Sequence, residues 1–335
     1  MAGYTPGEQP RTDDFIKLNT NENPYPPSPR VVAAIEDVLH NDRLRKYPDP
    51  LGTHLRETAG RVLGIDPDSV LIGNGSDDVL TILTRAFVRD GGLVVSPTPS
   101  YLLYKTLADI QGAKFTAVPF NDDWTLPKPW PMPKAELCFV PNPNSPSGTL
   151  VTAQALEELK DQLYCPLVVD EAYVDFAATN ALALAKLPNV IVTRSLSKSY
   201  SLAGLRFGFA VTSPPLVREL NKIKDSYNCD ALSLAGAAAA LEDQDYFRAI
   251  RAKIIGTRQR LEKELANIGF DAVPSHANFV WATAERPVQP IFEELKRRKV
   301  LVRYMNYAEE GDGLRISVGT DHEIDHLLSE LRNIV

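Results

Sequence analysis

Cysteine is scarce in this sequence, and its scarcity excludes two kinds of small cross-linked fold. Only Cys138, Cys165 and Cys229 occur among 335 residues, and they lie far apart. An odd number of widely spaced cysteines favours neither a disulfide framework nor a zinc site of the CxxC type, and it fits a reducing cytosol. We therefore expect three core thiols in a cytoplasmic protein.

Metal-binding motifs are missing as well. The five histidines form no HExxH pattern. His322 and His326 would share one face of a helix, but no third histidine or cysteine lies near them in the sequence. We therefore expect no metal site.

An excess of basic residues and a long apolar run are also absent. The net charge of −7 gives no electrostatic footprint for nucleic acid or an anionic membrane. The longest apolar stretch, residues 231–241, is too short to span a bilayer. Proline, asparagine and scattered charge occupy the first thirty residues in place of the apolar segment of a secretion signal. We expect neither nucleic-acid nor membrane partners.

The rest of the composition, with 44% hydrophobic and 24% charged residues, is that of an ordinary globular protein. From residue 68 onward, short apolar runs alternate with helical patterns, as parallel sheets require. Seven runs predict strands: residues 69–72, 93–95, 114–118, 137–140, 166–170, 189–193 and 207–212. Helical patterns occupy residues 76–88, 101–111, 152–163, 216–241 and 246–268. We expect an α/β fold with a doubly wound, mostly parallel, seven-stranded sheet.

The length suggests two domains preceded by an arm. Residues 1–28 are rich in proline and asparagine without a regular period, so we expect an extended arm that packs on the small domain or on a partner subunit. Residues 29–225 predict a large domain. Residues 226–335 predict a smaller α/β domain.

One lysine lies among hydroxyl side chains in TRSLSKSYSLAGLRFGFA, residues 193–210. Lys198 follows a predicted strand, where open α/β sheets bind ligands. The hydroxyls and Arg206 suit a dianion such as phosphate. A lysine near other cations and poorly hydrated walls loses proton affinity and becomes a nucleophile. The stretch indicates the pocket of a Schiff-base cofactor, although a serine-rich surface loop explains it equally well.

Asp170 ends another apolar run, in VVDEAY. A buried carboxylate needs a cationic partner or several hydrogen-bond donors to stay ionised. A protonated pyridine nitrogen would be such a partner and would remain an electron sink. Alternatively, Asp170 caps the next loop. Tyr173 could donate to a ring phenolate, or it could pack in the core.

Three weaker signals lie near other predicted strand ends. Residues 73–77, GNGSD, would open a helix capped by Ser76 and offer backbone N–H groups to a phosphate, but a simple turn explains them as well. Tyr101 and Tyr104 could each stack on an aromatic ring or pack in the core. Arg315, in LRISVG, suits either an anion or a structural ion pair.

With these residues in place, the sequence resembles the pyridoxal 5′-phosphate (PLP) enzymes of the aspartate-aminotransferase fold (fold type I), and among them the histidinol-phosphate aminotransferase family. The resemblance extends from Tyr4 nearly to the end of the sequence. It rests on nine motifs in order: LNTNENPYPPSP, KYPDP, GNGSDD, PSYLLY, NPNSPSG, VVDEAYVDF, SLSKSYSLAGLRFG, ANFV and LRISVGT. These motifs are more specific for fold and cofactor than for substrate.

The resemblance implies a cofactor role for each matching residue of the large, PLP-binding domain. Lys198 would bind PLP as a Schiff base and move the proton at the substrate α-carbon. Asp170 would pair with the pyridinium nitrogen, Tyr173 would hydrogen-bond the ring O3′, and Tyr101 would stack on the ring. The phosphate would be held by amides, hydroxyls and a guanidinium, those of Gly75, Ser76, Asp77, Ser195, Ser197 and Arg206.

The resemblance also implies partners and substrate contacts. Tyr47 would reach the phosphate of the partner subunit, which implies a homodimer with shared active sites. Arg315 would bind the carboxylate or phosphate of the substrates. The weaker substrate candidates are Arg303, Tyr4 and Asn23.

One departure from the family affects the cofactor site. The family usually has asparagine directly before the Pro-Thr-Gly of the loop at 142–148, and this asparagine donates to O3′. Ser145 stands there in this sequence. Either Ser145 or the neighbouring Asn144 would have to take this role.

The implied reaction is the transamination of L-histidinol phosphate with 2-oxoglutarate, which gives imidazole-acetol phosphate and glutamate in histidine biosynthesis. An aromatic amino-acid aminotransferase and a threonine-phosphate decarboxylase are alternatives with the same fold. From a different class, a non-catalytic phosphate-binding module would share the sheet, because fold alone does not determine function.

Overall fold

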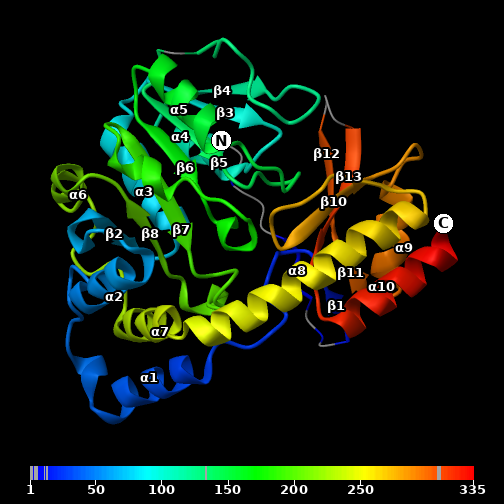
Figure 1. The fold of residues 1–335 in the computed structure, drawn as a ribbon, viewed down its shortest axis with the longest axis horizontal. Coiled ribbons are helices and arrows are strands. Elements are labelled where there is room, and N and C mark those ends of the chain that lie inside the picture. The colour runs from blue at the N-terminus through cyan, green and yellow to red at the C-terminus, as the bar shows by residue number, and fades with distance from the viewer. Residues whose placement is uncertain (1–2, 4–6, 11, 13, 133, 308–310) are drawn as a thin grey trace.

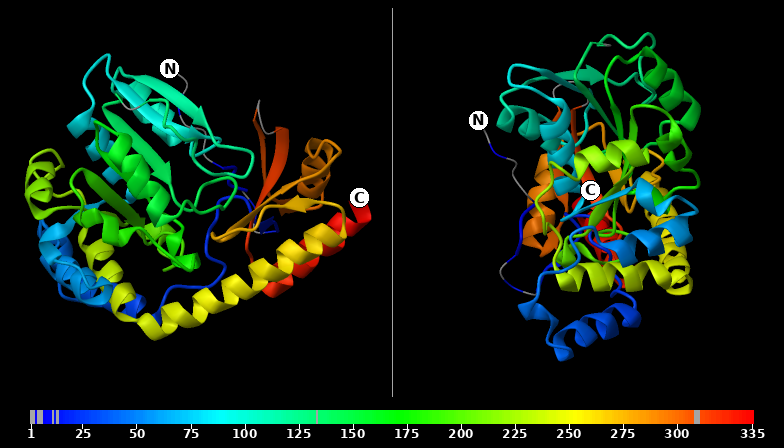
Figure 2. Two further views of the ribbon diagram at one scale, coloured as in Figure 1. Left: turned by 45° about the horizontal axis from the view of Figure 1, so that its top comes forward. Right: turned by 90° about the vertical axis from the view of Figure 1, so that its left-hand side faces the viewer.

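The computed structural model describes residues 3, 7–10, 12, 14–132, 134–307 and 311–335, and it divides into a large and a small unit (Figure 1). The large unit surrounds a seven-stranded sheet, and the small unit contains a four-stranded sheet. Helix α8 (Gln244–Asn267) extends from the large unit along the small one (Figures 1 and 2). In the described part of the chain, no helix is long and apolar enough to cross a membrane.

The strands of the large sheet are short, apolar and rich in valine, so the sheet is buried on both faces. Across the sheet their order is β2-β8-β7-β6-β5-β3-β4. Strand β8 is antiparallel to both of its neighbours, and the other adjacent pairs are parallel. The bounds are β2 (Val70–Gly73), β3 (Leu93–Thr98), β4 (Lys114–Pro119), β5 (Leu137–Pro141), β6 (Leu167–Asp170), β7 (Val190–Ser195) and β8 (Gly208–Val211). The predicted doubly wound, mostly parallel seven-stranded sheet is confirmed.

Helices cover both faces of this sheet and complete two apolar cores. One core includes side chains of α3 (Ser76–Phe87), α4 (Leu103–Ile110) and α6 (Pro214–Leu220). The other includes side chains of α1 (Pro29–His40), α2 (Thr53–Leu63), α5 (Ala153–Gln162) and α7 (Ala231–Glu242). Short 3₁₀ helices lie in the connections: η1 (Arg43–Arg45), η2 (Pro67–Ser69), η3 (Val174–Phe176), η4 (Leu182–Lys186) and η5 (Ala203–Leu205).

One predicted helix is wrong, because residues 216–241 form parts of two helices, α6 and α7. Residues 221–230 between them use polar side chains for tertiary contacts, and Lys224 donates to the carbonyl of Pro50 at 2.9 Å. Asp230 then begins α7 as its N-cap, since its carboxylate accepts hydrogen bonds from two backbone N–H groups of the first turn, both at 2.9 Å.

The small unit consists of an antiparallel sheet and helices that share its apolar core. The strand order is β12-β13-β10-β9, with bounds β9 (Asp271–Ala272), β10 (Phe279–Thr283), β12 (Arg303–Tyr307) and β13 (Gly311–Ser317). The C-terminal half of α8 packs here with α9 (Gln289–Arg297) and α10 (Asp321–Ile334). Helix α10 begins with a capping box between Thr320 and Glu323.

The N-terminal arm packs on the small unit. Strand β1 (Ile16–Lys17) pairs in parallel with β11 (Val300–Leu301). The next side chain, that of Leu18, belongs to the apolar core of the small unit. The chain then crosses to α1 on the large unit (Figure 1).

Helix α7 packs against α1 and α2, and its Ala237 and Leu241 belong to the core of the large unit. The C-terminal half of α8 instead contributes Leu261 and Leu265 to the small core. We therefore propose that the two domains divide within α8, and not after residue 225 as the sequence suggested.

Candidate active site

A cavity of about 230 Å³ lies where the strands of the large sheet end and the small unit begins. Asp170 ends β6 and Ser195 ends β7, and both residues line the cavity. Arg303 and Arg315 line it from the small unit. The carboxyl ends of parallel strands are where open α/β sheets bind ligands, so the topology itself brings these residues together.

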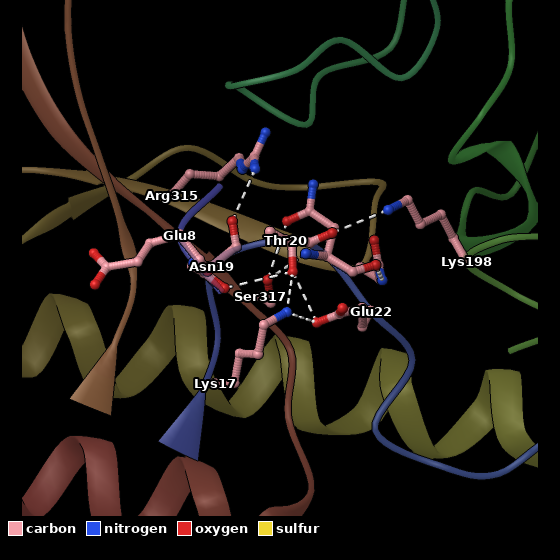
Figure 3. A network of polar contacts seen from close by, with 10 residues as sticks. Glu8, Lys17, Asn19, Thr20, Glu22, Lys198, Arg315 and Ser317 are labelled. Atoms are coloured by element: carbon pink, nitrogen blue, oxygen red, sulfur yellow. Dashed lines mark hydrogen bonds and ion pairs between the residues drawn. The ribbon is translucent and has the colours of Figure 1, made fainter. Parts of the chain in front are cut away.

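Lys198 lies in the loop after β7 and lines the cavity. Its Nζ donates a hydrogen bond to the carbonyl of Thr20 at 3.0 Å (Figure 3). Burial lowers the pKa of the amine to about 8, and the positive charge of Arg315 adds to this effect more than that of Arg206 does, while Glu22 opposes it. The amine is therefore partly neutral near physiological pH and able to act as a nucleophile.

Asp170 is a buried carboxylate, 5% exposed, at the base of the cavity wall. Tyr104 donates to its Oδ2 at 2.8 Å and Thr193 donates to its Oδ1 at 3.0 Å. Burial nevertheless raises the pKa of Asp170 above its ordinary value. In the described part of the chain no basic side chain forms an ion pair with it. A cationic group in the cavity would be the missing partner, because buried carboxylates are stable as anions only when paired.

Tyr104 has a role that the sequence did not indicate. Its ring stacks on Phe139 with centroids 4.7 Å apart, and its hydroxyl donates to Asp170. Burial raises its pKa well above the ordinary value, so the phenol keeps the proton that it donates. Tyr101 lines the cavity, and its hydroxyl donates to Asp77 at 3.2 Å. Both tyrosines line the cavity, but the ring of Tyr104 is stacked on Phe139, so Tyr101 is the candidate to cover a ligand ring.

The start of α3 and Arg206 form one end of the cavity. The predicted cap is wrong, because Gly75 is the N-cap and Ser76 the first helical residue. Gly75 has a φ of 85°, which favours glycine, and a Cβ atom there would lie 2.6 Å from Nη2 of Arg206 and displace that guanidinium. The guanidinium of Arg206 lies 3.4 Å from Asp77 and 3.5 Å from Ser197. Backbone N–H groups and a guanidinium here suit a phosphate.

The loop that contains Ser195 and Ser197 also lines the cavity. The backbone N–H of Ser197 donates to Oγ of Ser195 at 3.2 Å, which holds this turn in shape. Both predicted serines thus line the cavity, and Ser197 lies next to Arg206.

Arg303 and Arg315 lie directly opposite each other on β12 and β13. Nη1 of Arg315 donates to Oγ of Ser145 at 2.9 Å, and Nη2 donates to the carbonyl of Asn19 at 3.2 Å. Like charges at opposite positions of a sheet are destabilising on their own. This pair therefore suits an anionic ligand that carries more than one charge.

The structure distinguishes between Ser145 and Asn144. Ser145 lines the cavity beside Arg315. Asn144 is fully buried, and its Nδ2 donates to the carbonyl of Pro99 at 3.2 Å and to Ser147 at 2.9 Å. Its side chain therefore holds the loop, and Ser145 is the candidate for ligand contact.

Four predicted residues that the structure describes do not line the cavity of this chain: Gly75, Asn144, Tyr47 and Asn23. Tyr47 is 80% exposed and stacks on Tyr227, with ring centroids 4.4 Å apart. Asn23 donates to the backbone carbonyl of Lys198 at 2.9 Å, so it stabilises the lysine loop without lining the cavity. Tyr4 lies outside the described residues.

The residues just after β1 also contribute to the site, and the sequence did not indicate them. The carbonyls of Asn19 and Thr20 accept hydrogen bonds from cavity residues, and Nδ2 of Asn21 donates to Oη of Tyr173 at 3.1 Å. Tyr173 lines the cavity. The repeated asparagines of LNTNENP were a signal for this, since buried amides need partners, but the partners cannot be read from a sequence.

Comparison with known proteins agrees with this geometry. The family model of aminotransferase class I and II matches residues 13–331. The histidinol-phosphate aminotransferase of Rhodopirellula baltica is 53% identical over 97% of this chain and 91% of its own length. That of Syntrophotalea carbinolica is 47% identical over 100% of this chain and 97% of its own.

A solved structure is similar over the whole fold. The histidinol-phosphate aminotransferase of Sinorhizobium meliloti, in complex with pyridoxal-5′-phosphate, has a TM-score of 0.87 and 28% identity, over 95% of this chain and 90% of that chain. The family model and the full-length relatives agree with the cavity chemistry. The chain therefore belongs to the class I and II aminotransferases and, among them, to the histidinol-phosphate aminotransferase family.

Proposed function

We propose that this protein transfers the amino group of L-histidinol phosphate to 2-oxoglutarate in histidine biosynthesis, with PLP as cofactor. The observation that carries the proposal is one cavity in which Lys198, Asp170 and Arg206 face a pair of arginines from the small unit. The names of the full-length relatives support the same substrate.

The residues of the cavity fit PLP. Asp170 is a buried carboxylate that lacks a cationic partner in the described part of the chain, and a protonated ring nitrogen would supply one. Arg206 and the first N–H groups of α3 would hold the phosphate. Lys198, with its lowered pKa, would bind the aldehyde carbon.

When bound, PLP supplies an electron sink for the pair of electrons left on the substrate α-carbon. Lys198 Nζ would be the group that removes and returns the proton at the substrate α-carbon. The carboxylate of Asp170 would stabilise a positive charge on the ring nitrogen, and Tyr173 would donate to the ring oxygen. Tyr101 would cover one face of the ring and exclude water from it.

The substrate anion would lie between Arg303 and Arg315. Two guanidinium groups opposite each other match the two charges of a phosphate monoester better than the single charge of a carboxylate. The aromatic amino acids carry no second anion, so the arginine pair disfavours them as substrates. Glutamate and 2-oxoglutarate would use the same pair for their distal carboxylate.

We expect Arg303→Ala to lower kcat/KM for histidinol phosphate by about 10- to 100-fold, because one hydrogen-bonded charge to the phosphate is lost. Steady-state kinetics with histidinol phosphate, phenylalanine and phosphothreonine measures this. Arg297→Ala, on the exposed face of α9, is the matched control and should change little. Faster turnover of phenylalanine, or release of CO₂ from phosphothreonine without an oxo acid, would contradict the proposed substrate.

We also propose a homodimer in which Tyr47 reaches the cofactor phosphate of the partner subunit. Tyr47 and Tyr227 form an exposed stacked pair, and the neighbouring Leu44 and Leu51 are 62% and 40% exposed. Such a patch is typical of an interface. A mixture of Tyr47→Ala and Lys198→Ala chains should regain activity that neither variant has alone. Sedimentation as a monomer, or mixtures that stay inactive, would exclude shared sites.

We propose a cytoplasmic location, since Cys138, Cys165 and Cys229 are all unpaired and buried. Free thiols fit a reducing compartment. Fractionation of cells that express the tagged protein measures this directly, and recovery from an extracellular or periplasmic fraction would contradict it.

A further inference from the structure

The segment that follows β1 contacts the residues proposed for the chemistry. The carbonyl of Asn19 accepts a hydrogen bond from Arg315, and the carbonyl of Thr20 accepts one from Lys198 (Figure 3). The segment therefore lies between the two units and touches a residue from each. The next residue, Asn21, contacts Tyr173.

Asn21 is 1% exposed, and all of its polar groups have partners. Its backbone N–H donates to Oγ of Ser317 at 2.8 Å, and that hydroxyl donates to Oδ1 of Asn21 at 3.1 Å. Its carbonyl accepts a hydrogen bond from Asn278 at 2.9 Å. The remaining group, Nδ2, donates to Oη of Tyr173 at 3.1 Å. The small unit thus fixes which end of the amide faces the phenol.

A phenol oxygen that accepts a hydrogen bond from a fixed amide directs its own proton elsewhere. Tyr173 also lines the cavity, so a ligand bound there would come within reach of that proton. We infer that Asn21 is a positioning residue, which orients the hydroxyl of Tyr173 so that it donates to the ring oxygen of PLP. The inference rests on the proposed function, in which Tyr173 makes that hydrogen bond.

This role has a spectroscopic consequence. The nitrogen that would join Lys198 to PLP can carry a proton. Only after this proton is lost can the ring oxygen of PLP fully accept a hydrogen bond from another donor. A hydrogen bond from Tyr173 therefore favours the deprotonated form and lowers the pKa of that nitrogen. If Asn21 no longer orients the donor, the pKa should rise, and the pH midpoint of the visible absorption band should rise with it.

The backbone of Asn21 determines which substitutions are informative. Its φ of 56° lies in the left-handed region, where alanine is strained but glycine and aspartate are tolerated. Asn21→Gly removes the amide and keeps the backbone contacts with Ser317 and Asn278. Asn21→Asp keeps the shape and reverses the polarity, since a carboxylate accepts the proton of Tyr173.

The test is a pH titration of the visible absorption of the PLP-loaded protein. We expect Asn21→Gly to raise the midpoint by about half to one pH unit, which corresponds to one neutral hydrogen bond, and Asn21→Asp to raise it further. In a Tyr173→Phe background, Asn21→Gly should add nothing, because the group that it orients is gone.

The control is Asn19→Ala, which removes another buried amide of the same segment, one whose Nδ2 donates to the carbonyl of Glu8. We expect no shift of the midpoint in this variant. An equal shift in Asn19→Ala, or additive shifts of Asn21→Gly and Tyr173→Phe, would overturn the inference. If Tyr173→Phe alone leaves the midpoint unchanged, the proposed role of Tyr173 is wrong. If Tyr173→Phe raises it while both Asn21 variants leave it unchanged, only the inference about Asn21 fails.

Discussion

Replacement of Lys198 by alanine is expected to reduce turnover by about 10⁴-fold, the upper end of what a positioned acid–base group contributes. The variant loses both the nucleophile that binds PLP and the group that moves the proton at the substrate α-carbon. Treatment with borohydride should fix PLP to the unaltered protein and leave it free in the variant. Mass spectrometry of the reduced protein and steady-state kinetics measure the two effects.

Lys224 is the matched control for this experiment. It is also largely buried, and burial also lowers its pKa, but its amine donates to the carbonyl of Pro50, outside the cavity. Lys224→Ala should therefore keep the borohydride-fixed cofactor. Covalent retention of PLP in Lys198→Ala, or activity close to that of the unaltered protein, would contradict the proposed mechanism.

The lowered pKa of Lys198 also predicts the pH dependence of cofactor capture. The neutral amine is the nucleophile, and with a pKa of about 8 its fraction rises as the pH increases through that value. Stopped-flow mixing of the cofactor-free protein with PLP should show a rate that increases with pH and levels off above about pH 8. A rate that still increases tenfold per unit above pH 9 would indicate an unperturbed lysine.

The second large effect is expected for Asp170→Asn, with a loss of about 10²- to 10³-fold in kcat/KM. The neutral amide cannot stabilise a proton on the ring nitrogen, and removal of one partner from a buried charge pair costs about 3–5 kcal/mol. Cofactor affinity should fall in parallel. Kinetics at saturating PLP and fluorescence titration of cofactor binding separate the two losses.

Thr193→Val is the variant with which the loss of kcat/KM in Asp170→Asn is compared. It removes one hydrogen bond to Asp170 and leaves the carboxylate and its other donor, Tyr104, in place. A single neutral hydrogen bond corresponds to about a fivefold change. If Asp170→Asn costs no more than Thr193→Val, the carboxylate is a loop-capping group, as the alternative interpretation of the sequence held.

The sequence was sufficient to predict the positions of residues that directly follow a strand of the large sheet. Asp170 and Lys198 each follow a short apolar run, and the parallel topology brings such ends together whatever the details of packing. The same alternation of strands and helices predicts the large sheet. These inferences rest on periodicity, which a single sequence records.

Other features depend on contacts between distant segments. Asn21 and Tyr173 are 152 residues apart, and nothing local to either residue specifies their hydrogen bond. Tyr104 was open to two interpretations because its ring packs on Phe139 while its hydroxyl reaches Asp170. The break between α6 and α7 did have a local signal, the helix cap Asp230, which the apolar residues after it obscured.

The pairing of β1 with β11 has a consequence for biogenesis. The small domain includes Leu18 in its core and the hydrogen bond between Asn21 and Ser317, which joins residues 296 positions apart. On the ribosome, residues near position 18 emerge long before their partners, so they stay unsatisfied while the large sheet is still being synthesised. Contacts between segments so far apart in the sequence form slowly, because they are non-local. The catalytic pocket can therefore be completed only after both of these distant segments have been synthesised.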